Sequence, residues 1–466
     1  MNDKFAESIY QSGQSKVSLH EIDYVFDWIE NLKNKTKVNV EIISLKDLNQ
    51  WSFDENLGKI KHQSNKFFSI EGIEVETNWG NVNNWKQPII NQPEIGILGI
   101  LCKIIDGVLH FLIQAKIEPG NINVIQLSPT VQATKSNFTK VHNGNAPKFL
   151  EYFQNIKKDH IIIDQLQSEQ GARFLKKRNR NLVVYAEIVE ISDEFIWLTL
   201  NQIKKLLKIP NLVNMDTRTV LSGISNNLQE FTQHIDFESL SVFGRSLLKS
   251  SQKNHGILNS LFEVSSFITN LKFQYELITR NCNLLDLGDW IYDEQKIYHR
   301  DNKFFEVIGV NVSIENREVT NWTQPMIRPC NPGICAFILK EIDGIIYILV
   351  QSKIECGNLD IIELAPTVQC ITGDYKDPSY EVPYLDYLLN SDNGKIVLFD
   401  NYLSEEGGRF YHDVNRNIVV LANDDFDQIL PERYIWLTLN QVQSLLRFNN
   451  IFNIQARSLI STFVYE

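Results

Sequence analysis

Two stretches of the chain consist of apolar, largely β-branched residues interrupted by an Asp-Gly pair. The stretches are 96–117, with the pair at Asp106-Gly107, and 333–354, with the pair at Asp343-Gly344. Asp-Gly between two apolar runs is a strong signal for a β-hairpin. The pattern therefore predicts two hairpins, and it assigns both aspartates to turns rather than to catalysis.

Other stretches show the three- and four-residue apolar spacing of helices. The residues from Thr199 to Leu207 begin with a capping signal, and the ranges 237–248 and 256–277 are apolar on one helical face. Parts of the first forty residues also have helical spacing. With a further strand predicted over 124–132, each hairpin region belongs to an α+β unit, a mixed and mainly antiparallel sheet with helices packed on it.

The chain contains an internal repeat. Residues 84–132 align without a gap onto 321–369, and 24 of the 49 positions are identical. Flanking matches continue on both sides while the shift varies only between 236 and 239 residues. Each copy is long enough to close its own core. We therefore predict four segments, namely an N-terminal helical segment at 1–44, a first repeat at 45–222, a helical linker at 223–282 and a second repeat at 283–466.

Composition narrows the classes of function. The 466 residues carry a formal charge of −12 and are 43% hydrophobic, as in an ordinary globular protein. Such an acidic chain without a basic cluster is a poor candidate for nucleic acid or for an anionic membrane surface. It has neither an apolar run near the roughly 18 residues of a membrane span nor a signal-like start, so we expect a cytoplasmic protein. The six cysteines form no CxxC pair, which predicts reduced, mostly structural thiols and no zinc site.

The densest group of polar residues that both copies keep is Gln-x-Lys-x-Glu-x-Gly-Asn. Alternate residues of a strand point to one face, so Gln114, Lys116 and Glu118 are expected side by side, followed by a turn at Asn121. The motif returns as Gln351, Lys353, Glu355 and Asn358, and Pro-Thr-Val-Gln is likewise kept, with Thr130, Gln132, Thr367 and Gln369. A solvated strand face with a Lys–Glu pair is the simpler interpretation. We favour a functional site, because the residues between these polar positions differ from copy to copy.

Four further pairs of residues are candidates for binding. They are Arg173 and Arg409 in a Gly-containing turn, Arg180 and Arg416, His62 and His299, and Trp85 and Trp322 before a predicted Gln-Pro turn. The first two arginines are suited to an anion, although pairing with the neighbouring glutamate is an equally good interpretation. For the histidines and tryptophans, a place in the core is the simpler alternative. The sequence has no P-loop, GxGxxG, GxSxG or HExxH motif and no His/Cys cluster.

The order of these motifs, together with Phe-Phe-Ser-Ile-Glu-Gly and Trp-Leu-Thr-Leu-Asn-Gln, resembles the NDP-hexose 2,3-dehydratase family over almost the whole chain. The resemblance implies two Nudix-hydrolase-like domains, a homodimer, and a nucleotide-linked 4-keto-6-deoxyhexose as substrate, usually dTDP-linked. The Glu-rich metal helix of true Nudix hydrolases is absent, as the family leads one to expect. The copies differ in places, for example Pro119 against Cys356, so one copy is a candidate for specialisation.

The chemistry that the resemblance implies suits these residues. In a 4-keto sugar the C4 carbonyl acidifies the C3 proton, so a carboxylate can remove it and the C2 hydroxyl can then leave, without NAD, PLP or metal. Our hypothesis makes Glu118 or Glu355 the base and Lys116 or Lys353 the enolate stabiliser or acid. Arg173 or Arg409 would hold the diphosphate, and Trp85 or Trp322 would pack on sugar or base. A Nudix-type pyrophosphatase and a non-catalytic nucleotide-sugar-binding protein are the alternatives.

Overall fold

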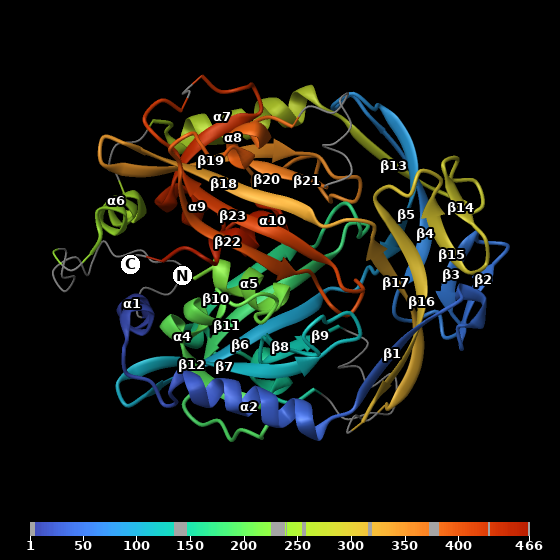
Figure 1. Ribbon diagram of the computed structural model, residues 1–466, viewed down its shortest axis with the longest axis horizontal. Coiled ribbons are helices and arrows are strands. Elements are labelled where there is room, and N and C mark those ends of the chain that lie inside the picture. Colours follow the sequence, from blue (N-terminus) through green and yellow to red (C-terminus); the bar gives the residue numbers. More distant parts are fainter. Residues whose placement is uncertain are drawn as a thin grey trace.

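The computed structural model describes residues 5–134, 147–224, 238, 240–253, 258–315, 319–371, 382–426 and 429–464. The fold is α+β and consists of two repeated halves, each with one large and one small sheet. In Figure 1 the two large sheets lie on the left, one above the other, and the two small sheets lie on the right.

The two large sheets have the same topology. The first has the order β10-β11-β6-β7-β12, with β8 on β7 and β9 on β6, and the second has the order β22-β23-β18-β19-β20, with β21 on β18 and β24 on β19. In each sheet one pair of strands, β6 with β11 or β18 with β23, is parallel and the other pairs are antiparallel. The predicted mixed, mainly antiparallel sheet is therefore confirmed. The strands of the first sheet are β6 (Gly96–Ile105), β7 (Val108–Ile117), β8 (Ile125–Ser128), β9 (Val131–Ala133), β10 (Ile161–Ser168), β11 (Arg178–Tyr185) and β12 (Phe195–Thr199). Those of the second are β18 (Gly333–Ile342), β19 (Ile345–Lys353), β20 (Glu363–Pro366), β21 (Val368–Ile371), β22 (Ile396–Ser404), β23 (Val414–Leu421) and β24 (Tyr434–Thr438).

The two small sheets exchange a strand. Strand β1 precedes the first small sheet in the chain but pairs with β16 of the second, and β13 correspondingly pairs with β4 of the first. Both exchanged strands can be followed across to the right of Figure 1. The strands are β1 (Val38–Ile43), β2 (Trp51–Asp54), β3 (Lys59–His62), β4 (Ser69–Thr77), β5 (Asn84–Asn91), β13 (Leu277–Cys282), β14 (Trp290–Tyr292), β15 (Lys296–His299), β16 (Phe305–Ile314) and β17 (Asn321–Pro329).

The helices also occur in equivalent pairs. Ser12 on α1 donates to the carbonyl of Leu109 and accepts from the N–H of Leu200, and Ser250 on α6 makes the same two bonds to Ile346 and Leu439. The predicted N-terminal segment and the predicted linker thus carry the same helices and strand in front of each repeat. The α-helices are α1 (Ala6–Gln14), α2 (Ile22–Lys35), α4 (Leu200–Leu206), α5 (Met215–Ser222), α6 (Val242–Ser251), α7 (Leu261–Gln274), α8 (Leu385–Leu389), α9 (Leu439–Leu445) and α10 (Ile454–Ile460). Short 3-10 turns are η2 (Leu45–Asp47), η3 (Leu150–Phe153) and η4 (Lys158–His160).

Both predicted hairpins form, and Asp106 and Asp343 lie in their turns with positive φ. The capping box predicted at Thr199 is also present at the start of α4. Two local predictions were wrong. The strand expected over 124–132 is two strands, β8 and β9, because the chain bends between them. The Gln-Pro step after each tryptophan lies inside β5 or β17 instead of forming a turn. Proline is tolerated there because each of these strands pairs along its length with one neighbour only, and the single bridges on the other side, Ile90 with Phe174 and Ile327 with Phe410, lie beyond the proline.

The large sheets are forked, and the fork determines where polar side chains converge. Strands β6 and β7 pair with each other only between the hairpin turn and the pair Leu101–Leu112. Beyond that pair they diverge, and β9 then pairs with β6 while β8 pairs with β7. At the branch point, the hydroxyl of Thr130 donates to the carbonyl of Leu112 at 2.5 Å and accepts from the N–H of Leu101 at 2.9 Å. The diverging ends of β7 and β9 carry Lys116 and Gln132, whose side chains both contact Glu118.

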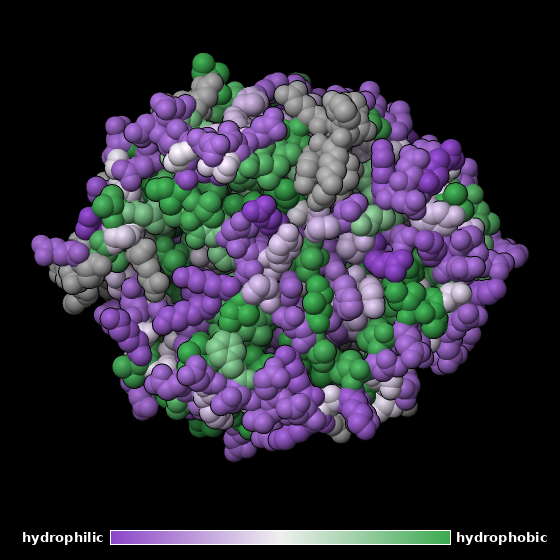
Figure 2. Space-filling model, viewed as in Figure 1, coloured by the Kyte–Doolittle hydropathy of each residue, from purple (hydrophilic) through white to green (hydrophobic). Residues whose placement is uncertain are grey.

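Apolar side chains fill both faces of each large sheet and the space between the two small sheets. On the face shown in Figure 2, hydrophilic residues cover most of the rim and hydrophobic residues show through nearer the middle. None of the six cysteines is paired in a disulfide, as predicted. Within the described ranges, no helix has the length and apolar character to cross a membrane.

Candidate active site

Two composite clusters of polar side chains lie where the halves interlock, each built from the fork of one half and a loop of the other, and we refer to them as the first and the second crevice. The turn after β7 contacts the loop between β22 and β23: the N–H of Gly120 donates to the carbonyl of Gly407 at 2.8 Å, and the N–H of His412 donates to the carbonyl of Gly120 at 3.0 Å. The mirror contact joins Gly357 to the carbonyl of Gly171 at 2.7 Å. Each site is therefore incomplete without the opposite half.

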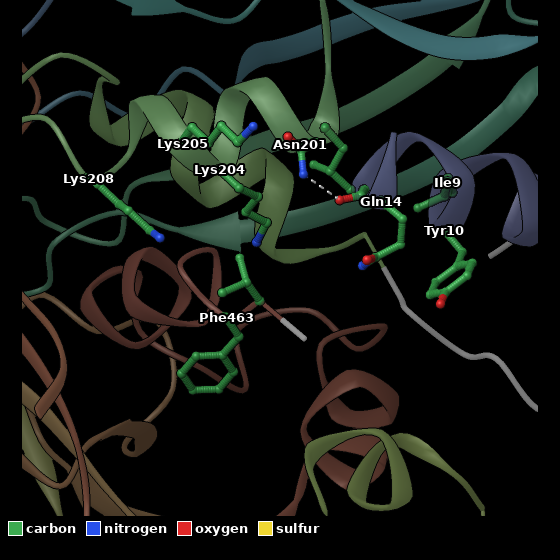
Figure 3. A pocket seen from close by; sticks show the side chains of 11 residues that line it. Ile9, Tyr10, Gln14, Asn201, Lys204, Lys205, Lys208 and Phe463 are labelled. Atoms are coloured by element: carbon green, nitrogen blue, oxygen red, sulfur yellow. Dashed lines mark hydrogen bonds between the residues drawn. The ribbon is translucent and has the colours of Figure 1, made fainter. Parts of the chain in front are cut away.

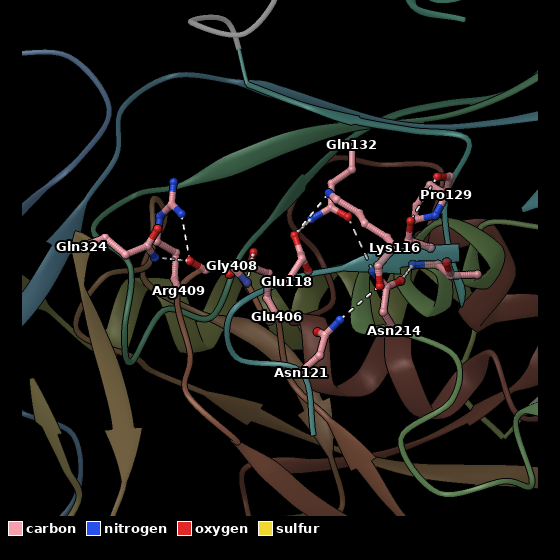
Figure 4. A network of polar contacts seen from close by, with 12 residues as sticks. Lys116, Glu118, Asn121, Pro129, Gln132, Asn214, Gln324, Glu406, Gly408 and Arg409 are labelled. Carbon is pink, nitrogen blue, oxygen red and sulfur yellow. Dashed lines mark hydrogen bonds and ion pairs between the residues drawn. The ribbon is translucent and has the colours of Figure 1, made fainter. Parts of the chain in front are cut away.

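The first crevice contains the predicted Lys-x-Glu pair (Figure 4). Lys116 Nζ lies 3.2 Å from Glu118 Oε1, and the same oxygen accepts from Gln132 Nε2 at 3.0 Å. The side chains of Lys116 and Glu118 are only 18% and 9% exposed. The pair thus faces the inside of the molecule and not bulk solvent.

The second crevice contains the same residues with different contacts. Gln369 Nε2 donates to Glu355 Oε1 at 2.9 Å, and the N–H of Gly171 donates to Glu355 Oε2 at 3.1 Å. The ammonium of Lys353 donates to the main-chain carbonyl of Gln369 at 3.3 Å. Both oxygens of this carboxylate are therefore held by donors other than the lysine.

The remaining residues of the two motifs mainly support the crevices. Asn121 Nδ2 donates to the carbonyls of Lys116 and Val124, both at 3.2 Å, and so fixes the turn after β7. Gln351 donates to the carbonyls of Pro366 and Thr367. Thr367 makes the same two hydrogen bonds in the second half that Thr130 makes at the fork of the first. Gln114 lies on β7 opposite Ser128, and Asn358 is buried in the turn after β19.

Arg409 and Arg173 enter the crevices from the loops of the opposite halves. The Arg409 guanidinium stacks on the ring of Phe68 and the Arg173 guanidinium on that of Phe305, both at 4.2 Å. The Nε of each arginine is buried and has no hydrogen-bond partner among the described residues. Burial lowers the pKa of both guanidinium groups, which nonetheless stay charged. They are cations with unused donors, as an anion site requires.

The two tryptophans brace these loops through a glutamine. Trp322 Nε1 donates to Gln324 Oε1 at 2.9 Å, and Gln324 Nε2 donates to the carbonyl of Gly408 at 2.7 Å. In the other half Trp85 donates to Gln87, which reaches the carbonyl of Ala172 at 3.1 Å. Each tryptophan therefore helps to hold the loop that carries the arginine, through the hydrogen bonds of one glutamine.

Four candidates are not brought to the crevices. Arg180 and Arg416 form bidentate ion pairs with Asp164 and Asp400 across neighbouring strands. His62 and His299 belong to aromatic clusters of the small sheets: His62 lies against Trp51 and Phe67, and His299 against Trp290 and Phe304.

Sequence reasoning missed two acids of the first crevice, Glu406 and Asp216. Glu406 lies in the opposing loop between Arg409 and Glu118 (Figure 4), and its Oε1 accepts from the N–H of Gly408 at 2.9 Å. Asp216, in the first turn of α5, is 2% exposed and its Oδ1 has no hydrogen-bond partner among the described residues. The second crevice has Gln170 and Gln455 at the equivalent positions. Both acids would have been found by looking for aligned positions at which the two copies differ. They could not be found by looking for positions at which the copies are identical.

Burial and like charges shift the proton affinity of these acids. Desolvation, together with the charges of Glu118 and Glu169, raises the pKa of Glu406 to about 7. Desolvation, followed by the charges of Glu169, Glu406 and Glu118, raises the pKa of Asp216 well above its ordinary value. The first crevice thus contains one carboxyl group, that of Glu406, with a pKa near neutrality, and a second, that of Asp216, with a pKa shifted in the same direction. In the part of the chain that the structure describes, no three His, Cys, Asp or Glu side chains are arranged to hold a metal ion.

Comparison with known proteins identifies relatives over nearly the whole length. The family model described as NDP-hexose 2,3-dehydratase matches twice, over residues 22–224 and 261–463. Proteins named dTDP-4-dehydro-6-deoxy-alpha-D-glucopyranose 2,3-dehydratase are 43% identical in Saccharopolyspora spinosa, 41% in Streptomyces violaceoruber and 39% in Amycolatopsis orientalis. These alignments cover 93%, 90% and 93% of this chain and 90%, 91% and 88% of the relatives.

Proposed function

The chain belongs to the NDP-hexose 2,3-dehydratase family, and from this premise we propose that it eliminates the C2 hydroxyl of dTDP-4-keto-6-deoxy-D-glucose in the composite crevices. One structural observation carries the proposal. A carboxylate and an ammonium 3.2 Å apart, Glu118 and Lys116, lie in a largely buried crevice beside Arg409, a cation with unused donors. This set can hold an anionic substrate and move protons on its sugar.

The reaction begins at C3. The C4 carbonyl makes the C3 proton acidic, and Glu118, or Glu355 in the second crevice, removes it. The electron pair moves onto the C4 oxygen, where the ammonium of Lys116 or Lys353 stabilises the enolate. Expulsion of the C2 hydroxyl as water and tautomerisation of the resulting enol give a 3,4-diketo-2,6-dideoxy sugar. The carbonyl of the substrate itself accepts the electrons throughout.

The loop arginines are proposed to bind the diphosphate. Arg409 or Arg173 would turn its free Nε–H and outer N–H groups to the phosphate oxygens, while the stacked phenylalanine keeps the guanidinium plane fixed. Trp322 and Trp85 are assigned to holding the loop, because each is joined to it through one glutamine.

Three broader properties are proposed with the reaction. We propose that each half is a Nudix-like domain, and the forked mixed sheet supports this. We propose a homodimer, for which the exposed apolar residues Phe262 and Phe273 of α7, 79% and 91% exposed, offer a surface. Light scattering on the eluting protein would measure the mass. A place in the cytoplasm fits a nucleotide-linked substrate.

The test is incubation of the purified protein with dTDP-4-keto-6-deoxyglucose in the presence of a chelator, followed by NMR or mass spectrometry of the sugar. We expect loss of the C2 oxygen without added metal, and little or no product from a Glu118→Gln, Glu355→Gln double variant. Unchanged substrate would contradict the proposal, and release of a nucleoside monophosphate only with added Mg²⁺ would favour the pyrophosphatase instead.

A further inference from the structure

The elimination needs a proton donor for the departing hydroxyl, and the Lys-x-Glu pair does not supply an independent one. Glu118 receives the C3 proton, and the Lys116 ammonium is engaged with that same carboxylate. Resting on the function proposed above, we propose that Glu406, from the opposite half of the chain, is the catalytic acid that protonates the leaving C2 hydroxyl.

Glu406 faces Glu118 across a glycine. A Cβ built on Gly408 would lie 2.4 Å from Glu406 Oε1 and 3.4 Å from Glu118 Oε1, so both carboxyl groups border the space beside this residue. The N–H of Gly408 holds Oε1 of Glu406 at 2.9 Å, whereas the shielded Oε2 has no partner among the described residues. One oxygen is thus anchored and the other is available to carry a proton.

The second crevice lacks this donor. Gln170 replaces Glu406 there, and its amide is already used, because Nε2 donates to Glu405. Gln455 correspondingly replaces Asp216. An amide of this kind cannot deliver a proton as a carboxylic acid does, so the second crevice keeps the carboxylate, lysine and arginine, but at the position of Glu406 it has an amide bonded to the buried Glu405.

Asp216 is an independent sign that the first crevice is built to hold protons. A charged carboxylate that is 2% exposed, with one oxygen unpaired, would be costly to bury, and protonation removes most of that cost. The charged and titratable groups that face Glu406 are Glu118, Glu169, Asp216, Arg409 and Lys177. Three of these five groups are acids, and the charges of Glu118 and Glu169 favour the protonated form of Glu406.

The proton balance then closes within the crevice. The C3 proton moves to Glu118, and the C2–O bond breaks as the proton of Glu406 joins the hydroxyl to form water. The enol proton on the C3 oxygen returns to Glu406, and the proton held by Glu118 moves to C2. Both carboxyl groups end as they began, and the sugar has lost one water.

The deciding experiment compares two readouts in D₂O, incorporation of deuterium at C3 of the substrate and formation of the product. All variants carry Glu355→Gln, so that exchange reports the first crevice alone. In this background we expect Glu406→Gln to lower product formation at least about 100-fold, as loss of a general acid does, while exchange at C3 continues. Glu118→Gln in the same background should lose both, since neither crevice then has its base. Exchange without elimination distinguishes the acid from the base, because exchange needs only the proton-abstraction step.

Controls separate this proposal from the proposed function. The exposed Glu187→Gln should leave both readouts unchanged, and thermal unfolding checks the fold of each variant. Should Glu406→Gln fail to fold, Glu406→Asp keeps an acid on a shorter side chain, and we expect slower elimination with undiminished exchange. Product formation by Glu406→Gln within threefold of the unaltered protein, or loss of exchange together with elimination in a folded variant, would overturn the assignment. Failure of the unaltered protein to eliminate would instead overturn the proposed function.

Discussion

At the scale of single residues, the first prediction concerns the pH dependence of turnover. An acid catalyst must be protonated, and burial with neighbouring carboxylates raises the pKa of Glu406 to about 7. We therefore expect kcat/KM to fall about tenfold per pH unit above pH 7, measured from initial rates of product formation. In Glu406→Gln the residual rate should lack this decline. A decline of the same slope and midpoint in that variant would assign it to another group.

Lys204 gives a second prediction, on stability. Its ammonium lies at a small cavity of about 30 Å³ between α1, α4 and the end of the chain (Figure 3). It donates to the carbonyl of Ser461. Burial lowers the pKa of Lys204 to about 7. Between that value and the ordinary 10.5, the unfolded chain binds more protons than the folded one, so this residue makes stability rise with pH across that range.

The equivalent of Lys204 in the second half is Gln443, which offers a natural replacement. We expect Lys204→Gln to raise the free energy of unfolding near pH 7 by roughly 1–3 kcal/mol, because an incompletely paired buried charge is removed. The gain should vanish near pH 11. Urea titration at several pH values measures it, with the exposed Lys205→Gln as control. A loss of stability at pH 7 would show that the bond to Ser461 outweighs desolvation.

The residues of the candidate site were predictable to the extent that both copies keep them. Lys116, Glu118 and Gln132 were found as identities, and alternation along a strand correctly placed the first two on one side. Glu406 and Asp216 escaped because each crevice takes its residues from both halves, and at these positions the halves differ. Arg180, also an identity, pairs with Asp164, since repetition of a residue reports structural roles as readily as chemical ones.

At the scale of elements, the turn after β7 provides the third prediction. A Cβ on Gly120 would lie 1.7 Å from the carbonyl oxygen of Phe410 and 2.8 Å from that of Gly407, so only glycine lets this turn meet the opposite loop. We expect Gly120→Ala to cost roughly 1–3 kcal/mol of unfolding free energy, as overpacking does, and to lower turnover because Glu118 and Arg409 move apart. Thermal unfolding and product assays measure the two effects.

Gly13 in α1 is the matched control for that substitution. Its added Cβ would meet only Leu200 Cδ2, at an ordinary 3.7 Å, so Gly13→Ala should stabilise the helix by about 0.5–1 kcal/mol. Equal behaviour of the two variants would mean that contact with the opposite loop does not constrain the turn after β7.

Sequence signals within a few residues predicted individual strands and helices well, but they did not predict which strands pair with each other. The Asp-Gly hairpins and the capped helix α4 depend on contacts within a few residues, and both formed as expected. The pairing of β1 with β16 joins residues more than 260 positions apart, as in Val38 with Ile314. Nothing in the alternation of a strand specifies which edge it will meet, because every open edge offers the same backbone groups. The division into repeats therefore did not foresee the exchanged strands.

At the scale of the whole molecule, two buried arginines join the halves near the centre. Arg218 on α5 donates to Ser458 Oγ at 2.7 Å and to the carbonyl of Ser404, while Arg457 on α10 donates to Thr219 Oγ1 at 2.7 Å and to the carbonyl of Ser168. Ser404 and Ser168 begin the two loops that close the crevices. The contacts that hold the halves together thus also position the site loops.

The last prediction follows from this interlocking. A chain divided between residues 224 and 238 leaves each half without an edge strand of its small sheet, because β1 and β13 belong to the opposite piece. It also exposes the apolar surface of the shared core and leaves the carbonyl partners of Arg218 and Arg457 on the other piece. We expect either piece alone to lack a cooperative unfolding transition, since an unpaired edge and a bare core do not offset the entropy of folding.

Co-expression of the two pieces should restore the molecule, because all contacts across the division are non-covalent. We expect them to copurify, to unfold in one transition at a lower temperature than the intact chain, and to regain elimination, since each crevice again receives residues from both halves. A second piece that carries Glu406→Gln should still restore the fold when it is co-expressed with the first piece, but it should not restore elimination. A first piece that folds and eliminates alone would show that the crevices do not need the opposite half, against the shared site.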